Sequence, residues 1–224
     1  MELKVTKYNF IKARMKRLEE AYKQSCDQQV RNAVKEKTFY EIAGEIDDFY
    51  EKFGDLFEIC KMSSLMEITK LIETVMSEYS AISLPTIEIS QAKRILKLKD
   101  RDLNNFVKAY NQVVSKQPIT YYSQIIDQKI VFLTQINGEF VGTVGQVTKD
   151  RRNRESLCAF CRKFRRGDEI VFVTTSTSVK NNGEYSAIGQ YCCSDYNRCN
   201  NSIEDSGVLD EFVSFAMVKK KIKK

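Results

Sequence analysis

Two cysteine-rich stretches decide the fold of this chain: Leu157-Cys158-Ala159-Phe160-Cys161-Arg162 and Gly189-Gln190-Tyr191-Cys192-Cys193-Ser194-Asp195-Tyr196-Asn197-Arg198-Cys199-Asn200. They hold five of the seven cysteines in a sequence of 224 residues that contains no histidine. Two thiol pairs separated by a hairpin-sized insert are typical of a tetrahedral structural zinc site. Because the chain lacks histidine, any metal bound here should have thiolate ligands.

The elements expected between and after the two stretches favour the layout of a treble clef. Residues 169–175 and 184–193 are β-like runs, and a polar turn containing Asn181-Asn182-Gly183 joins them. Ser194 or Asp195 can then cap a short helix that carries Cys199. A knuckle, a hairpin and a helix bearing the last ligand make up a treble clef, which we expect over about residues 157–204.

The alternation of side chains along a strand selects the third ligand. In residues 189–193, Gly189, Tyr191 and Cys193 share one face, whereas Cys192 points to the other. We therefore assign one structural zinc ion to Cys158, Cys161, Cys193 and Cys199 and interpret Cys192 as a packed thiol, although Cys192 in place of Cys193 stays open. Four thiolates around one zinc leave a charge of about −2, which the nearby Arg162, Lys163, Arg165, Arg166 and Arg198 can offset.

Redox and disulfide chemistry are the alternatives for these cysteines. No βαβ pattern surrounds Cys158 and Cys161, and a second pair follows, so a redox pair is disfavoured. The cysteine count is odd and no signal peptide is evident, which points to a reducing cytoplasm rather than to disulfides. Cys26 and Cys60 lie in helical patterns and are expected to be small buried hydrophobes.

Residues 1–82 are predicted to form an antiparallel helical bundle. Apolar residues recur there at steps of three and four, which places each set on one helical face. Residues 27–37 can extend the second helix or form a short helix of their own, and Gly54 is expected to end the second helix. The three sets are Tyr8, Ile11, Met15, Leu18 and Tyr22; Phe39, Ile42, Ile46, Phe49 and Phe53; and Leu65, Ile68, Leu71, Ile72, Val75, Tyr79 and Ile82.

A break at Ser83-Leu84-Pro85 marks the predicted domain boundary, because proline disfavours a helix at the residue before it. Residues 83–224 are expected to form a mixed α/β domain, so the fold class is α+β with two domains. This domain should contain helices over residues 89–98 and 102–114, then strands over 119–126, 129–135 and 140–147 with Asn137-Gly138 as a hairpin turn. After the finger, a C-terminal helix is expected to bury Leu209, Phe212, Val213 and Ala216.

The motifs of the second half resemble the FusB-type family of fusidic acid resistance proteins, which bind elongation factor G. The resemblance rests on C-x-x-C followed by G-x-Y-x-C-x-D-x-x-x-C-N, which matches Cys158, Cys161, Gly189, Tyr191, Cys193, Asp195, Cys199 and Asn200. Residues 97–103, 119–122 and 138–142 are also similar to the central region of that family. The resemblance covers residues 84–224 with recognisable motifs, and it implies a fourth, short helix in the N-terminal bundle.

The resemblance implies a non-catalytic zinc protein that binds elongation factor G and frees it from ribosomes stalled by fusidic acid, without binding the drug. Tyr191 and Phe212 stand at family-like positions, where each is either a partner-binding anchor or part of the core. Catalysis has little support, since the chain lacks histidine and any Walker A or Rossmann glycine motif. No apolar run is long enough to span a bilayer, so we expect a cytoplasmic protein.

Charge favours a binding function but leaves the partner open. Residues 1–82 hold 13 Lys and Arg against 15 Asp and Glu, whereas residues 83–224 hold 23 against 15, a balance of +8. Such a basic domain suits an acidic protein surface or a nucleic acid. The alternative function is therefore rRNA or other nucleic-acid binding by the finger. The lysine-rich residues 219–224 are interpreted as a solvated end or as an rRNA-seeking tail.

Overall fold

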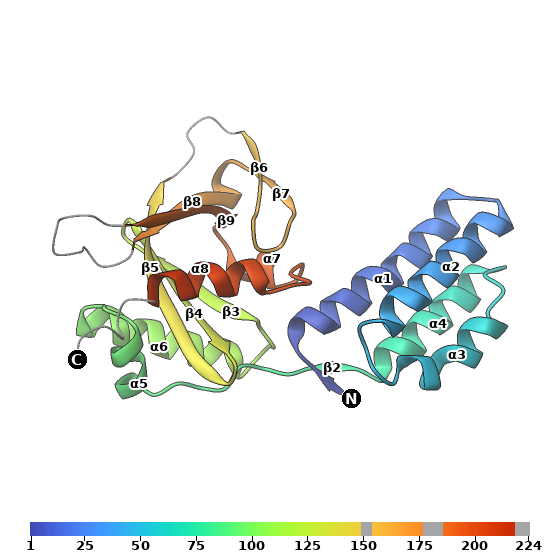
Figure 1. Ribbon diagram of the computed structural model, residues 1–224, viewed down its shortest axis with the longest axis horizontal. Helices are drawn as coiled ribbons and strands as arrows, with labels where there is room; N and C mark the ends of the chain where they lie inside the picture. The colour runs from blue at the N-terminus through green and yellow to red at the C-terminus, as the bar shows by residue number, and fades with distance from the viewer. Residues whose placement is uncertain (149–153, 177–185, 218–224) are drawn as a thin grey trace. The chain divides into compact units, whose positions relative to one another are not determined.

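The computed structural model describes residues 1–148, 154–176 and 186–217 (Figure 1). The chain divides into two compact units, Met1–Ile82 and Ser83–Lys224. Among the described residues, no helix is long and apolar enough to cross a membrane. The expected turn at Asn181-Asn182-Gly183, the side chain of Ala216 and the lysine-rich residues 219–224 lie outside the described residues.

The first unit is an antiparallel bundle of four helices, as the family resemblance implied. A short parallel pair, β1 (Glu2–Leu3) with β2 (Ser80–Ala81), brings the two ends of the unit together. The core between the helices consists of large apolar side chains, among them Ile11, Met15, Phe49 and Ile68. The helices are α1 (Val5–Gln24), α2 (Gln28–Ala43), α3 (Phe49–Ile59) and α4 (Leu65–Ser77).

The expected second helix is in fact two helices, and Gly54 does not end it. Residues 28–37 belong to α2, and Asp27 caps its first turn, with its side chain accepting from the Gln29 N–H at 2.8 Å. The apolar stripe continued through the turn because Ile46, which lies between α2 and α3, is also buried. Gly54 lies inside α3, because burial of Phe57 further along outweighs the roughly 1 kcal/mol that glycine costs a helix.

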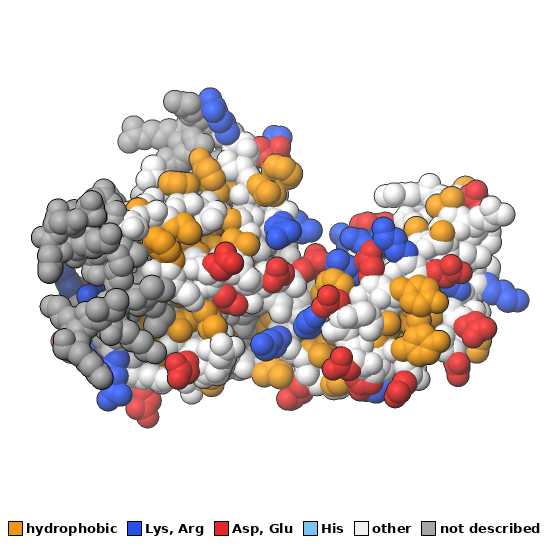
Figure 2. All heavy atoms as spheres, in the orientation of Figure 1, with side chains coloured by type: hydrophobic (Ala, Val, Ile, Leu, Met, Phe, Trp, Pro, Cys, Tyr) orange, Lys and Arg blue, Asp and Glu red, His pale blue; other side chains and the backbone are white. Residues whose placement is uncertain are grey.

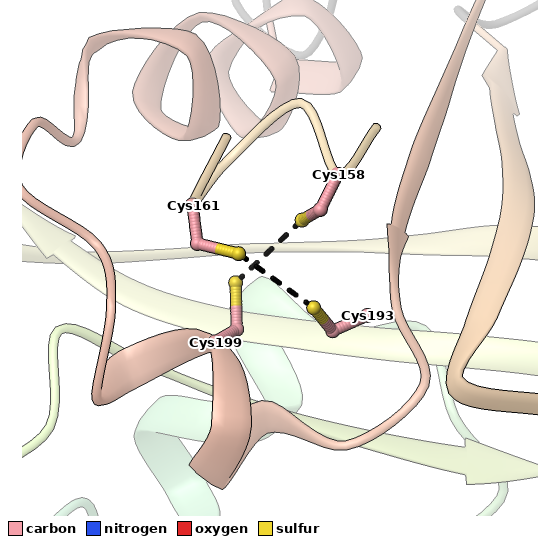
Figure 3. Close-up of side chains that lie close together, drawn as sticks. All are labelled: Cys158, Cys161, Cys193 and Cys199. Atoms are coloured by element: carbon pink, nitrogen blue, oxygen red, sulfur yellow. Dashed lines mark hydrogen bonds between the residues drawn. The ribbon is translucent and has the colours of Figure 1, made fainter. Parts of the chain in front are cut away.

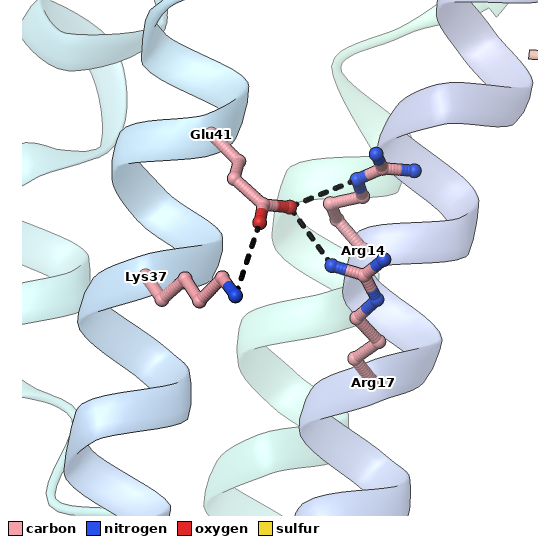
Figure 4. Close-up of polar contacts among 4 residues, drawn as sticks. All are labelled: Arg14, Arg17, Lys37 and Glu41. Atoms are coloured by element: carbon pink, nitrogen blue, oxygen red, sulfur yellow. Dashed lines mark hydrogen bonds and ion pairs between the residues drawn. The ribbon is translucent and has the colours of Figure 1, made fainter.

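An ion-pair cluster joins α1 to α2 (Figure 4). Glu41 on α2 accepts from Arg14 Nε at 3.0 Å and from Arg17 Nη1 at 2.9 Å, both on α1. Lys37 lies one turn before Glu41, with its Nζ 3.9 Å from the other carboxylate oxygen. Arg17 and Lys37 are exposed, and exposed pairs contribute less than about 1 kcal/mol each, whereas Arg14 and Glu41 are partly buried. The cluster therefore fixes the pairing of the two helices more than it stabilises them.

The second unit is built on a five-stranded antiparallel sheet. Its strand order is β3-β4-β5-β8-β9, and a separate two-stranded hairpin, β6–β7, carries the first cysteines. The elements in chain order are α5 (Ile89–Ile95), α6 (Asp100–Val114), β3 (Tyr121–Ile126), β4 (Lys129–Ile136), β5 (Glu139–Thr148), β6 (Glu155–Leu157), β7 (Phe164–Arg166), η1 (Gly167–Glu169), β8 (Ile170–Ser176), β9 (Ala187–Cys193), α7 (Tyr196–Asn200) and α8 (Gly207–Met217).

The turn between β4 and β5 has the conformation that its sequence predicts. Asn137 and Gly138 have φ angles of 51° and 82°, and Ile136 pairs with Glu139 across them. Two central residues with positive φ form a two-residue hairpin turn whose twist matches the flanking strands. The Asn-Gly signal therefore sets the register of the central hairpin.

Both faces of this sheet are buried. Tyr121, Ile130 and Phe132 pack into a core with the finger and α8, whereas Tyr122 and Val131 face a second core with α5 and α6. Burial on both faces explains why β4 reads as a continuous apolar run instead of an alternating one. The finger thus rests on a rigid layer that is supported from behind.

We predict that Gly54→Ala stabilises the helical unit by about 0.5–1 kcal/mol. A Cβ at this position would meet no atom within 4 Å, and alanine loses less backbone entropy on folding than glycine does. Urea unfolding followed by helical circular dichroism measures the change. As the control, Gly142→Ala should be destabilising, because a Cβ there would lie 2.7 Å from Leu96 Cδ2 and from the Phe132 carbonyl oxygen. A loss of stability in Gly54→Ala contradicts the prediction.

Candidate metal centre

The first two predicted ligands lie at the tip of the β6–β7 hairpin. The Cys158 N–H donates to the Lys163 carbonyl at 3.0 Å, and the Arg162 N–H donates to the Cys158 carbonyl at 2.9 Å. Arg162 has a φ of 53°, in the left-handed region, which turns the chain sharply after Cys161. This tight knuckle directs both thiols to the same side.

The other two ligands come from the end of β9 and from α7. Cys193 pairs with Ile170 at the last position of the sheet, and Asp195 then caps α7 by accepting from the Asn197 N–H at 2.8 Å. Cys199 follows in the last turn of this helix and is fully buried. The knuckle, the hairpin strand and the short helix therefore occur in the expected order.

The four thiols converge to the size of a tetrahedral zinc site (Figure 3). All four sulfur atoms lie within 4.8 Å of one another, with Cys158 Sγ 3.8 Å from Cys199 Sγ and Cys161 Sγ 3.7 Å from Cys193 Sγ. Zn–S bonds of about 2.3 Å in a tetrahedron place the sulfur atoms about 3.8 Å apart. These separations are far longer than the roughly 2.05 Å of a disulfide bond, and all four cysteines are free.

The shared environment of the thiols favours deprotonation of some of them and opposes it in the others. Hydrogen bonds from the Cys161, Cys193 and Cys199 thiols lower the pKa of Cys158 below its ordinary range. Hydrogen bonding to Cys158 in turn raises the pKa of both Cys193 and Cys199. The pKa of Cys161 is also lowered, so two of the four thiols ionise readily and two resist ionisation. A divalent cation is needed to hold all four as thiolates.

Cys192 is not part of the cluster. Its side chain is fully buried in the core beneath the finger, and burial raises the pKa of its thiol. The sulfur atoms that lie within 4.8 Å of one another belong to Cys158, Cys161, Cys193 and Cys199, and that of Cys192 is not among them. The structure therefore brings Cys193 to the other three sulfur atoms and leaves Cys192 in the packed position that the strand alternation predicted.

The basic residues near the finger divide into two groups. Arg198 pairs with Glu169, and Arg166 Nε lies 3.5 Å from Glu155 Oε1. Arg162 and Lys163, in contrast, are exposed and make no ion pair within the described part of the chain. Their positive charges border the knuckle and offset the charge of about −2 that four thiolates and one zinc carry.

Hydrogen bonds join the finger to the sheet at two places. The Ala159 N–H donates to the Tyr191 carbonyl at 2.8 Å, which attaches the knuckle to β9. Asn200 Oδ1 accepts from the Thr120 N–H at 2.6 Å, and its Nδ2 donates to the Tyr121 carbonyl at 2.8 Å, which attaches α7 to β3. The asparagine that follows the last cysteine is therefore a buried link between the finger and the sheet.

The two predicted partner-binding residues lie in different environments. Tyr191 is 36% exposed, and its ring centroid is 5.0 Å from that of Phe172. Phe212 is only 1% exposed and packs with its ring centroid 5.7 Å from those of Phe132 and Phe160. Phe212 is therefore a core residue, since α8 turns that face toward the sheet, and partner contact stays a prediction for Tyr191.

Two exposed apolar residues of the finger were missed. Leu157 and Phe164 are 46% and 63% exposed, and they lie opposite each other in the β6–β7 register. Their side chains share one face of the hairpin, next to the unpaired Arg162 and Lys163. The signal was present in the sequence, since both residues flank the knuckle in a hairpin too short to cover both of its faces.

The comparisons with known proteins agree with this geometry. Residues 119–216 match the model of the FBP C-terminal treble-clef zinc-finger family. A search of curated proteins gave no significant match. Among solved structures, the fusidic acid resistance protein FusC is similar with a TM-score of 0.66 and 16% identity, over 96% of this chain and 97% of that one. The C-terminal unit thus contains a site for one structural zinc ion.

We predict that replacing any one of Cys158, Cys161, Cys193 and Cys199 by serine abolishes stoichiometric zinc binding and unfolds the finger. The finger has little core of its own, so metal binding supplies much of its folding free energy. Elemental analysis and thermal melts measure both effects. Cys192→Ala is the matched control, which should keep one zinc per chain at a cost of about 1 kcal/mol. A full zinc complement in Cys193→Ser would overturn the proposed ligand set.

Asn200→Ala should lower the stability of the second unit by more than about 2 kcal/mol while zinc content is retained. The substitution leaves the backbone groups of Thr120 and Tyr121 without their side-chain partner in a buried position. Asn201→Ala, one position further on and exposed, is the control and should be nearly neutral. Equal stability of the two variants in urea unfolding argues against this link.

Proposed function

We propose that this chain, whose residues 119–216 form an FBP C-terminal treble-clef zinc-finger domain, is a non-catalytic protein of the FusB type that binds elongation factor G. In this proposal it works in the cytoplasm and promotes release of the factor from ribosomes stalled by fusidic acid. The similarity to FusC shows a shared fold. The motifs of the finger support the proposal that the partner is elongation factor G and that binding releases it from the ribosome.

The observation that carries the proposal is a set of exposed apolar side chains on a finger whose four cysteines form a metal site. We name Leu157, Phe164 and Tyr191, with the basic Arg162 and Lys163, the finger patch. Apolar and aromatic side chains of this kind are the anchors on which protein interfaces depend, and neighbouring charges steer association. Exposed leucine and phenylalanine favour a protein partner over the phosphate backbone of a nucleic acid, which basic residues alone would bind.

The donor set of the metal centre argues for a structural role. Four thiolates fill the coordination sphere of zinc and leave no position for water or substrate. The chain has no histidine to act as a general base near neutral pH. The proposed action is therefore binding alone, without modification of the drug.

Binding can release the factor only through a difference in affinity. A ligand shifts a conformational equilibrium by the ratio of its affinities for the two states. The protein must therefore bind the loosened or released factor more tightly than the stalled one. Protection should consequently increase with protein concentration and should leave fusidic acid chemically intact.

We expect Leu157→Ala and Phe164→Ala each to weaken binding to purified elongation factor G by about fivefold or more, because both remove interface anchors. Co-elution and calorimetry with the zinc-loaded full chain measure the affinity. Ile89→Ala, which removes an exposed apolar side chain on α5 of the same unit, is the matched control and should bind normally. Normal affinity in all three variants would exclude the finger patch.

A reconstituted translation assay with fusidic acid tests the functional step. Added protein should raise factor turnover in a saturable way, and the drug recovered afterwards should be unmodified.

Nuclease treatment of the components before the co-elution step separates direct protein binding from binding through RNA. Co-elution that nuclease abolishes would support the nucleic-acid alternative, and modified drug would sink the proposal.

A further inference from the structure

We propose that the helical unit carries a binding site of its own, an acidic aromatic groove between α2 and α3 that takes a basic segment of a protein partner. The groove has a volume of ≈ 580 Å³. Its rim consists of Glu36, Tyr40, Tyr50, Glu51, Asp55 and Glu58. This inference stands on the first unit alone and does not depend on the function of the finger.

Aromatic rings form the apolar part of the groove. Phe39 lies at its base, 7% exposed, with the rings of Tyr40 and Tyr50 centred 5.4 Å and 5.5 Å away. Tyr40 and Tyr50 themselves are 66% and 61% exposed. Figure 2 shows exposed hydrophobic side chains interspersed with acidic ones on the visible face of the helical unit. Both tyrosine rings are therefore exposed to solvent and accessible to a ligand.

The acidic side chains of the groove differ from other carboxylates of the bundle, because they form no ion pair among the described residues. Elsewhere in the bundle, Glu41 pairs with Arg14 and Arg17, and Asp48 pairs with Lys52. The rim carboxylates are Glu36, Glu51, Asp55 and Glu58. None of them forms an ion pair within residues 1–148, 154–176 and 186–217.

Lys35 is the one cation among the residues that line the groove, and its ammonium group binds a backbone carbonyl instead of a rim carboxylate. Lys35 is 9% exposed, and its ammonium donates to the Cys60 carbonyl at 2.6 Å. With four carboxylates and one lysine among the lining residues, the groove has a formal charge of −3. The field at its mouth therefore attracts cations and repels nucleic-acid phosphates.

Gly54 keeps the groove open. It lies in the interior of α3, where a Cβ would meet no atom within 4 Å. Glycine there costs helix stability, and neither a turn nor close packing requires it. A larger side chain at this position would project into the groove.

These features select a basic peptide segment as the occupant. Guanidinium and ammonium groups pair with carboxylates and stack over tyrosine rings, while their aliphatic stems and neighbouring leucines contact the aromatic base. Two adjacent helices with apolar and charged positions between them suit an amphipathic helix laid along the groove. The site thus has the charge opposite to that of the finger patch.

The probe is a fluorescein-labelled synthetic peptide that carries arginine and leucine at helical spacing. Its counterpart carries glutamate in place of every arginine. With the zinc-loaded full chain, we expect saturable fluorescence anisotropy for the arginine peptide, weakening as salt is raised, and no binding of the glutamate peptide. Equal binding of both peptides, or of neither, overturns the proposal.

Variants locate the binding on the protein. Glu51→Gln/Glu58→Gln should weaken the arginine peptide about three- to tenfold, and Gly54→Leu should weaken it at least as much by filling the groove. Glu73→Gln on α4, which changes an exposed carboxylate outside the groove, is the matched control and should bind normally. Circular dichroism checks that each variant is folded.

Two further outcomes would also overturn the assignment. Undiminished peptide binding by folded Glu51→Gln/Glu58→Gln and Gly54→Leu would place the peptide elsewhere on the chain. Light scattering that shows a dimer, which the groove variants convert to a monomer, would instead make a second copy of this chain the occupant.

Discussion

The second unit depends on bringing four sulfur atoms to one point from segments far apart in the sequence. Cys158 and Cys199 are 41 positions apart, yet their sulfur atoms lie 3.8 Å from each other. Closing a chain of that length costs entropy that a hairpin and a five-residue helix cannot recover from apolar burial alone. Metal–thiolate bonds offset this cost. The hydrogen bonds from Ala159 to Tyr191 and from Asn200 to β3 then hold the folded finger against the sheet.

The sheet meets this demand because both of its faces are buried. Alternate residues of β3 and β4 serve two separate cores, one beneath α5 and α6 and one beneath the finger and α8. Gly142 and Gly145 have the same function on the two faces, since a Cβ would lie 2.7 Å from Leu96 in one case and 2.4 Å from Val173 in the other. Because the sheet supports the finger, Leu157 and Phe164 can stay exposed while the finger remains folded.

Local signals predicted the second unit well. The fold class, the Asn137-Gly138 turn and the convergence of Cys158 with its three partners follow from spacing, period and capping, which are short-range rules. The failures concern tertiary burial. Because Ile46 is buried in the turn between α2 and α3, the apolar pattern did not reveal that the helix ends there. Because Phe57 is buried, α3 continues past Gly54. For Phe212, helical period marks an apolar face but does not say whether a sheet or a partner covers it.

Opposite charge separates the two proposed surfaces. The finger patch is apolar and carries the basic residues Arg162 and Lys163, whereas the groove is aromatic with a formal charge of −3 among its lining residues. A ligand that suits one surface is repelled by the other, so the two do not compete for the same segment. A partner that offers an acidic and a basic segment can engage both, and the second contact is then intramolecular, which raises avidity without a new interface. Opposed charges on two units joined by one chain therefore favour partners with mixed surface charge over uniformly charged RNA.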